Sequence, residues 1–346
     1  MSNRTLIVDS NYLLKRSING AKEVYTNGIH FGGVFQFFTT IRKHITLHKI
    51  NKVILFWDGE NGGLDRHLLS LDYKAKRKHK SWSEKIELTD AEIKREMEKD
   101  TSVLWQEKRI NAYAEELFLR QICVETIEAD DLIGQYVLEH HQTEELFILT
   151  NDRDYLQFLD LNITIIFGNM DHPTTKSNFY FDFGYHYSNA LLFKIICGDD
   201  SDGIKGVGGI SEETLMKDFP DLCFKPMMVR DICLLAESHN KQRVSEKKKP
   251  FKKYENLVNS VPKLILNHKL INLREPFLND NAFEALEQLE MPLSPENRGS
   301  KNLYKLMQED DFFSVYNSTF VNYVEPFYNV IMNEKKLLIE YNKKFS

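Results

Sequence analysis

Residues 146–154 contain a short apolar run that ends in two aspartates: Leu146-Phe147-Ile148-Leu149-Thr150-Asn151-Asp152-Arg153-Asp154. The same order occurs twice more, where Leu6-Ile7-Val8 precedes Asp9 and where Val53-Ile54-Leu55-Phe56 approaches Asp58. Apolar runs of this length are typical of strands buried inside a parallel sheet. In α/β folds the ligand site lies beyond the carboxyl ends of such strands. We therefore expect an α/β fold whose acidic side chains converge at one edge of the sheet.

Two more acidic clusters follow the same logic, at Glu128-Ala129-Asp130-Asp131 and at Asp199-Asp200-Ser201-Asp202. The first should stand at the start of a helix, which would direct its acids toward different metal ions. Asp152 and Asp154, two residues apart, would share one side of an extended segment. Any single cluster is more typical of solvated acids or helix caps. Four clusters at element ends instead predict a shared cation site, and oxygen ligands favour magnesium or manganese over zinc.

Composition limits the possible classes of protein. The chain has 346 residues, of which 42% are hydrophobic and 28% charged, as expected for a folded globular protein with one large core or two domains. Its four cysteines form no Cys-x-x-Cys pair, so we expect intracellular thiols and no zinc site. Without a signal segment or an apolar run of 18 residues, the sequence predicts a cytoplasmic protein with no membrane partner.

The order of the patterns predicts an architecture of two parts. Residues 1–185 should form a doubly wound, mostly parallel sheet with helices near 35–47 and 131–141 and a strand near 179–181. A charged insert at 60–120 interrupts this part and includes a helical stretch over 83–100. Residues 186–346 should be mainly helical, with a helix over 189–197 before a glycine-rich turn.

Basic residues gather in two runs, so the net charge of −6 is unevenly distributed. The run from Lys74 to Lys80 carries Tyr73 and Trp82, which suits either a solvated helix face or a surface that draws in a single strand. The run from Lys241 to Lys253 favours a loop or tether with nonspecific phosphate contacts.

Glycine-rich Gly206-Val207-Gly208-Gly209 offers uncovered backbone amides that could hold a phosphate, although such turns are more often tight connections. The neighbouring acids do not fit an EF-hand, because its first ligand would fall on Gly198.

Together these residues resemble the flap endonuclease or 5′-3′ exonuclease family over residues 5–220. The matching blocks are Leu6-Ile7-Val8-Asp9-Ser10-Asn11, Arg66 with Tyr73-Lys74-Ala75-Lys76-Arg77, Glu128-Ala129-Asp130-Asp131, Thr150-Asn151-Asp152-Arg153-Asp154-Tyr155-Leu156-Gln157, and Gly198-Asp199-Asp200-Ser201-Asp202-Gly203-Ile204-Lys205-Gly206-Val207-Gly208-Gly209-Ile210. The resemblance implies a PIN-like nuclease domain, a helical arch at 60–120 and a helix-three-turn-helix element near 190–220. The size of the chain and its helical tail resemble those of the tailed-phage ribonucleases H. This resemblance would place the protein in the cytoplasm of a phage host.

This resemblance implies a division of roles among the residues. Two Mg²⁺ ions, replaceable by Mn²⁺, would be held by Asp9, Asp58, Glu128, Asp130 and Asp152 at the first site and by Asp131, Asp154, Asp199 and Asp202 at the second. Lys74 and Arg77 would be catalytic and hold the scissile phosphate. Implied nucleic-acid contacts are Arg66, Tyr73, Lys76, Lys78, Lys205, Gly206, Gly208 and Gly209, with a potassium ion at the glycine turn. Gly203, Gly208 and Ser211 stand where the family usually has Asn, Pro and Gly.

The implied enzyme is a monomeric structure-specific 5′ nuclease that hydrolyses RNA primers and DNA flaps, acting on DNA and RNA–DNA substrates with 5′ ends. A single-strand-binding protein or sliding clamp is an implied partner. Three alternatives stay open: a PIN-type ribonuclease, a noncatalytic junction binder, and a small-molecule phosphohydrolase. The last expects Asp-x-Asp after the first strand, whereas the chain has Asp9-Ser10-Asn11.

Overall fold

A computed structural model describes residues 3–21, 24–26, 29–75, 90–296, 298–315 and 319–345. Contacts group the chain into two compact units, of which unit 1 comprises residues 1–62, 80–151 and 278–346, and unit 2 comprises residues 63–79 and 152–277. This grouping differs from the predicted division at residue 185, because residues 278–346 return to the unit that holds the sheet.

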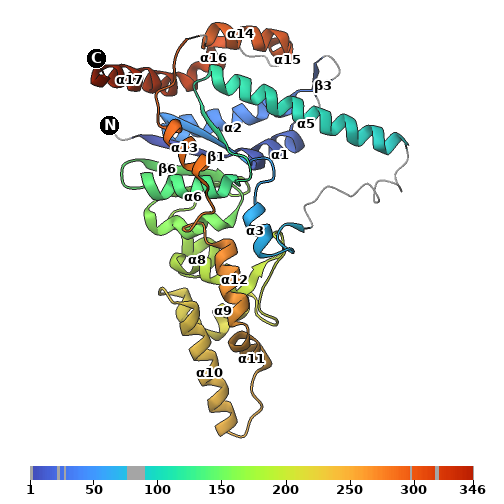
Figure 1. The fold of residues 1–346 in the computed structure, drawn as a ribbon, viewed down its shortest axis with the longest axis vertical. Coiled ribbons are helices and arrows are strands. Elements are labelled where there is room, and N and C mark those ends of the chain that lie inside the picture. Colours follow the sequence, from blue (N-terminus) through green and yellow to red (C-terminus); the bar gives the residue numbers. More distant parts are fainter. Residues whose placement is uncertain are drawn as a thin grey trace. The chain divides into compact units, whose positions relative to one another are not determined.

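Unit 1 is built around parallel strands in the order β5-β4-β1-β6, of which β1 and β6 are labelled in Figure 1. The strands are β1 (Arg4–Asp9), β4 (Lys52–Trp57), β5 (Arg120–Cys123) and β6 (Glu145–Thr150). In the register of this sheet, Ile7 lies opposite Ile54 on one side and Ile148 on the other. All six residues of β4 are buried, so both faces of the sheet are covered. The three predicted apolar strands are confirmed, whereas β5 was not predicted.

Helices cover this sheet in unit 1. The helix α1 (Ser10–Gly20), α2 (Gly32–His48) and α6 (Ala129–His140) each contact β1, and the last two confirm the helices predicted near 35–47 and 131–141. The other elements are β2 (Tyr25–Thr26), β3 (Ile29–His30), α5 (Asp90–Glu116), α13 (Asp280–Leu289), α14 (Ser300–Glu309), α15 (Phe312–Val315), α16 (Phe320–Val324), η5 (Glu325–Phe327) and α17 (Tyr328–Phe345). Of the helical stretch predicted over 83–100, residues 83–89 lie outside the described residues.

Unit 2 is mainly helical. Its elements are α3 (Leu64–Leu69), η2 (Arg153–Leu161), β7 (Thr164–Phe167), α7 (Phe179–Phe183), η3 (Tyr187–Asn189), α8 (Ala190–Cys197), β8 (Gly198–Asp199), β9 (Ile204–Lys205), α9 (Glu212–Asp218), η4 (Pro220–Cys223), α10 (Val229–Ser245), α11 (Lys252–Asn259) and α12 (Val261–Ile271). The prediction of a strand near 179–181 was wrong: Phe179, Phe183 and Tyr185 pack on one another, and the helix ends at Gly184 with φ 78°. Tertiary packing of the aromatic rings overrides their β propensity.

The C-terminal helix α17 packs against the sheet of unit 1. Helix α17 contacts β4, and a buried ion pair joins Glu334 of α17 to Arg120 of β5, with an Nη2–Oε2 distance of 2.6 Å. No helix among the described residues combines the length and apolar character needed to cross a membrane.

Candidate metal centre and nucleic-acid surface

The first acidic group lies in unit 1 at the carboxyl ends of β1 and β4. Asp9 ends β1, and its two carboxylate oxygens accept hydrogen bonds from Tyr12 N at 3.1 Å and Thr150 Oγ1 at 3.0 Å. Asp58 Oδ1 accepts from Ala129 N at 2.9 Å, which fixes the start of α6 beside β4. The sheet therefore aligns the acids as the strand pattern predicts.

Burial and neighbouring negative charge both disfavour the ionised form of Asp9. Burial raises the pKa of Asp9, and the nearby charge of Asp130 raises it further, to about 7. At the start of α6, Glu128 and Asp131 are only 4% and 1% exposed. Buried carboxylates this close together need positive charge or protons to balance them. The group is thus suited to binding cations.

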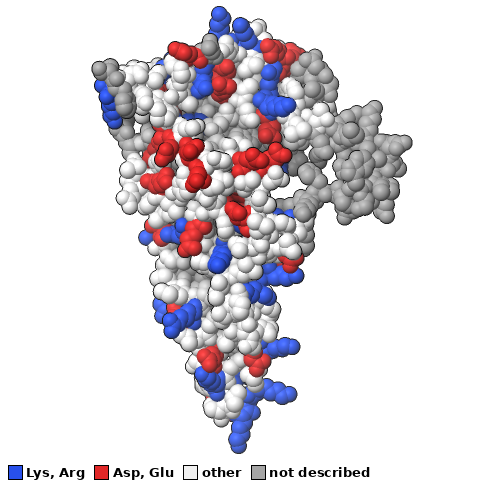
Figure 2. Space-filling model, viewed as in Figure 1, with Lys and Arg blue, Asp and Glu red and all other residues white. Residues whose placement is uncertain are grey.

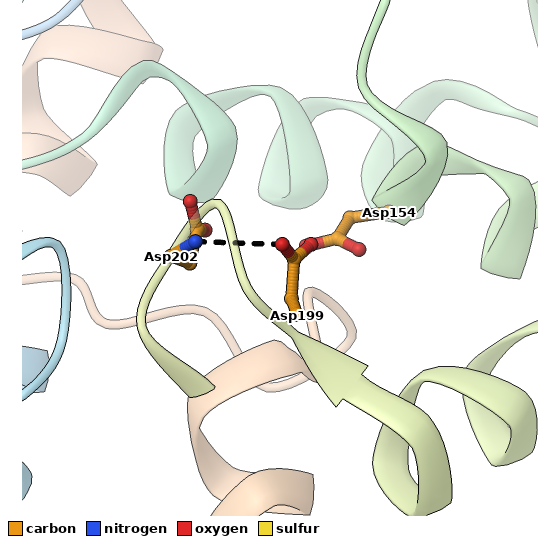
Figure 3. A group of neighbouring side chains, drawn as sticks. All are labelled: Asp154, Asp199 and Asp202. Carbon is orange, nitrogen blue, oxygen red and sulfur yellow. Dashed lines mark hydrogen bonds between the residues drawn. The ribbon is translucent and has the colours of Figure 1, made fainter. Parts of the chain in front are cut away.

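A second acidic group lies in unit 2, where Asp154 of η2, Asp199 at the end of β8 and Asp202 in the following loop come together (Figure 3). One carboxylate oxygen from each lies within 4.8 Å of the others. Asp152 caps η2, and its Oδ1 accepts from Asp154 N at 2.8 Å. Asp154 therefore occupies the first turn of a 3₁₀ helix and not the extended segment that we expected.

Lys194, which belongs to none of the sequence motifs, forms ion pairs with this second group. Its Nζ lies 2.8 Å from Asp154 Oδ1 and also contacts Asp199. Burial lowers the pKa of Lys194, but the three surrounding aspartates more than offset this and hold the pKa above its usual value. A lone cation within the apolar helix Ala190–Cys197, five residues before an acid, was the available signal.

Hydrogen bonds hold Asp199 in an ionised state. Burial raises its pKa, but Lys194 and both the hydroxyl and amide of Ser201 lower it, and the net pKa is about 2. Asp202 is 6% exposed, and its amide lies 3.4 Å from Asp199 Oδ1. The loop thus presents its carboxylates toward a common point.

These donor atoms fit a divalent cation. Opposite oxygens around an octahedral Mg²⁺ are about 4 Å apart, which is close to the spread of the second group. The carboxylates are hard oxygen ligands, and no cysteine or histidine belongs to the described group. Asp154, Asp199 and Asp202 would hold the ion. The first two of these also form ion pairs with Lys194.

Lys74 lies beside the loop that carries Asp202. Its backbone N donates to Asp202 O at 2.7 Å, and its φ is 47°. The predicted contacts Lys76, Lys78 and Arg77, as well as Trp82, lie outside the described residues.

Arg66 and Tyr73 need a correction, because they are buried within unit 2. Arg66 is 2% exposed and its Nε donates to Leu270 O at 2.9 Å, while Tyr73 is 5% exposed and packs with Ile204 and Leu270. Neither side chain offers the exposed surface that the predicted nucleic-acid contacts require. Both hold the 63–75 segment against α12.

The glycine turn joins β9 to α9. Gly208 and Gly209 are exposed, and within the described chain their amide N–H groups donate to no protein oxygen. The carbonyls of Gly208 and Gly206 accept from Asn256 Nδ2 at 2.9 Å and Lys263 Nζ at 3.3 Å. Lys205 extends from the same segment with a side chain that is 77% exposed. The turn therefore presents donors, as the sequence predicts, while two of its carbonyls are already engaged.

Comparisons with known proteins agree with this geometry. A family model described as the 5′-3′ exonuclease, N-terminal resolvase-like domain, matches residues 4–184. A 5′-3′ exonuclease of Mycoplasmopsis pulmonis is 28% identical over 64% of this chain and 68% of its own length. One of Halalkalibacterium halodurans is 28% identical over 55% of this chain and 57% of its own length.

Solved structures share the fold. The phage T5 D15 flap endonuclease, solved as a pseudo-enzyme–product complex with DNA and metal ions, superposes with a TM-score of 0.62 at 15% identity, covering 88% of this chain and all of the other. This likeness confirms the predicted PIN-like α/β nuclease fold. Because the family model spans more than half of the sequence, this chain belongs to the 5′-3′ exonuclease family and is a nuclease.

Proposed function

We propose that the chain is a divalent-metal-dependent, structure-specific 5′ nuclease that removes RNA primers and DNA flaps from duplex DNA. The observation that carries this proposal is the meeting of Asp154, Asp199 and Asp202 within 4.8 Å, beside the loop segment of Lys74. Family relatives described as 5′-3′ exonucleases support the polarity, and the T5 complex with DNA and metal ions supports the substrate and cofactor.

Each group of residues has a proposed task. Magnesium is the preferred ion, held by the acids of unit 1 and by those of unit 2. Divalent cations at such carboxylates activate water as a nucleophile and offset the charge that builds up on the phosphate. Lys74 and Arg77 would hold the scissile phosphate, and Lys205 with the glycine turn would bind the duplex backbone. A potassium ion at that turn, a clamp or single-strand-binding partner, a monomeric state and a cytoplasmic location remain further parts of this proposal.

The test uses three 5′-labelled substrates: a DNA flap, an RNA-primed nick and free single-stranded RNA, each with magnesium and with chelator. We expect magnesium-dependent cleavage at the flap junction and at the primer 5′ end. Cleavage of free RNA alone would favour a PIN-type ribonuclease. Binding of the junction without any cleavage would favour a noncatalytic junction binder.

A matched pair of variants connects the activity to the site. Asp154→Asn should lower the cleavage rate by about 100-fold or more while junction binding persists, because the ligand charge is removed. Asp171→Asn, an exposed position outside both acidic groups, should cleave normally. Near-normal cleavage by Asp154→Asn would contradict the proposed metal centre.

A further inference from the structure

The basic run at residues 241–253 forms a defined helical hairpin. It begins in the last turns of α10, and it ends in the first turn of α11, and these two helices contact each other (Figure 1). The run contains seven lysines and arginines and one acid, Glu246, in a chain whose net charge is −6. Figure 2 shows Lys and Arg side chains projecting at the tip of this hairpin. We call residues 241–253 the basic hairpin.

Internal contacts hold the turn of the basic hairpin in one conformation. Arg243 Nε donates to Lys249 O at 2.9 Å, and its guanidinium lies 3.8 Å from the ring centroid of Phe251. Asn240 donates to Phe251 O at 3.1 Å and accepts from Phe251 N at 2.8 Å. The sequence favoured a tether here, but these contacts order the segment. A preordered surface loses less conformational entropy when it binds a partner.

Three lysines of the basic hairpin have no acidic partner among the described residues. Lys247, Lys249 and Lys252 are exposed, and in the described part of the chain none of them forms an ion pair. Lys252 also begins α11, at the positive end of the helix dipole, where Phe251 provides no side-chain cap. Cations at that position destabilise a helix slightly unless an anion is near. This arrangement is unfavourable for folding and favourable for binding a polyanion.

The basic hairpin lies next to the glycine turn in unit 2, through contacts that α11 makes. Asn256 of α11 donates to Gly208 O at 2.9 Å, and a Cβ added at Gly209 would lie 3.5 Å from Cβ of Lys253. One helix thus connects the free lysines to the exposed amides of Gly208 and Gly209. Exposed amides of the glycine turn and lysines of the hairpin, which α11 brings together, suit the regularly spaced phosphates of a nucleic-acid strand better than a compact acidic peptide.

We infer that the basic hairpin is a second contact for the phosphate backbone of duplex DNA, which extends the surface that begins at the glycine turn. This inference rests on the proposed function, since it assumes that the chain binds a duplex. The contact is independent of base sequence. It adds affinity only for substrates whose duplex is long enough to reach the hairpin.

The experiment compares two triple variants with the same change in charge. The test variant carries Lys247→Ala, Lys249→Ala and Lys252→Ala, and the control carries Lys301→Ala, Lys305→Ala and Lys335→Ala at exposed positions of unit 1. Fluorescence anisotropy would measure binding to flap substrates with a series of duplex lengths, in chelator and over a range of salt concentrations. Thermal unfolding checks that both variants fold like the wild type.

We expect the test variant to bind long duplexes about 10-fold more weakly at low salt, with the log–log salt slope reduced by about 2 to 3. Binding of the shortest duplex and the cleavage rate at saturating substrate should stay unchanged, as should all properties of the control.

If the wild type binds and cleaves but the test variant binds long duplexes equally well, the inference is wrong while the proposed function stands. A wild type without duplex binding would overturn both. The same measurement is made with an acidic peptide. If the wild type binds this peptide and the test variant does not, while both bind the duplex equally, the hairpin is a site for a protein partner instead.

Discussion

Lys194 places its ammonium group against Asp154, with Nζ 2.8 Å from Oδ1, and it also contacts Asp199. These are two of the three carboxylates that fit a divalent cation. The lysine side chain is 18% exposed, so its charge is poorly screened by water. Lys194 thus balances the acids when no cation is bound, and it shares ligand oxygens with the cation in the proposed site.

Lys194→Met should separate the stabilisation that the lysine gives to the aspartates from its competition with the cation. In chelator we expect the free energy of unfolding to fall by about 3 kcal/mol, because two mostly buried carboxylates lose their partner. With magnesium present the loss should shrink, and the apparent magnesium affinity should rise, because no ammonium group competes for the oxygens. Urea unfolding over a series of magnesium concentrations measures both quantities.

The control for this prediction is Lys225→Met, which removes an exposed ion pair with Asp221. It should change stability by less than about 1 kcal/mol with or without magnesium. An unchanged magnesium dependence in Lys194→Met would show that the lysine does not share the cation site.

Local patterns were enough to predict strands β1, β4 and β6 and to place an acid at or just after the end of each of them. The runs before Asp9, Asp58 and Asp152 are apolar because their strands are buried on both faces, and burial leaves a clear signal in sequence. Strand β5 gave no such signal. Half of it is polar, and its Arg120 is compatible with a buried sheet only because Glu334, 214 residues away, neutralises it.

The burial of Arg66 and Tyr73 could not be predicted from the motif to which they belong. A motif gives residue types and spacing, and both features suit nucleic-acid contact. Whether a side chain is exposed depends on what packs over it, and here α12 supplies Leu270 to both residues. That contact joins residues about 200 positions apart and could not be read from the motif.

The surroundings of Gly203 explain why the chain has glycine at a position where the family usually has Asn. Its φ is 74°, and an added Cβ would lie 2.2 Å from Asp72 O, so the 72–74 segment approaches too closely for any side chain. We expect Gly203→Ala and Gly203→Asn each to lower the free energy of unfolding by about 2 kcal/mol or more. Asn tolerates positive φ better than Ala, but both clash equally.

The same clash should displace the bond from Lys74 N to Asp202 O and weaken magnesium binding, as measured by calorimetry. Gly20→Ala is the control, because a Cβ there meets nothing within 4 Å. If Gly203→Asn restored the family residue without loss of stability, the close approach would not constrain this loop.

His44 should make stability dependent on pH. It is 8% exposed, and burial, followed by the charges of His48, Lys43 and Arg16, lowers its pKa to about 4. Since the unfolded chain has a histidine pKa of about 6.5, it binds more protons than the folded one between these values. The contribution of His44 to stability is therefore present above pH 6.5 and lost as the pH falls toward 4.

Between pH 7 and pH 5 this amounts to a loss of about 2 kcal/mol. His44→Leu should remove that part of the pH dependence, so its stability relative to the wild type should improve by the same amount at pH 5. Urea unfolding of both proteins at the two pH values gives the comparison. An equal pH dependence in both proteins would rule out His44 as the cause.

Arg120 and Glu334 should be strongly coupled in stability. They form two hydrogen bonds, Nε–Oε1 at 2.8 Å and Nη2–Oε2 at 2.6 Å, and both side chains are at most 2% exposed. Glu334→Gln should cost about 3 kcal/mol or more, because it leaves a guanidinium buried without its counter-charge. A double-mutant cycle with Arg120→Met and Glu334→Met should show a coupling of about 2 kcal/mol or more, since removing both charges also removes the desolvation cost. Additive losses would mean that α17 is held to β5 by packing alone, and the ion pair would then have no part in anchoring the C-terminal residues.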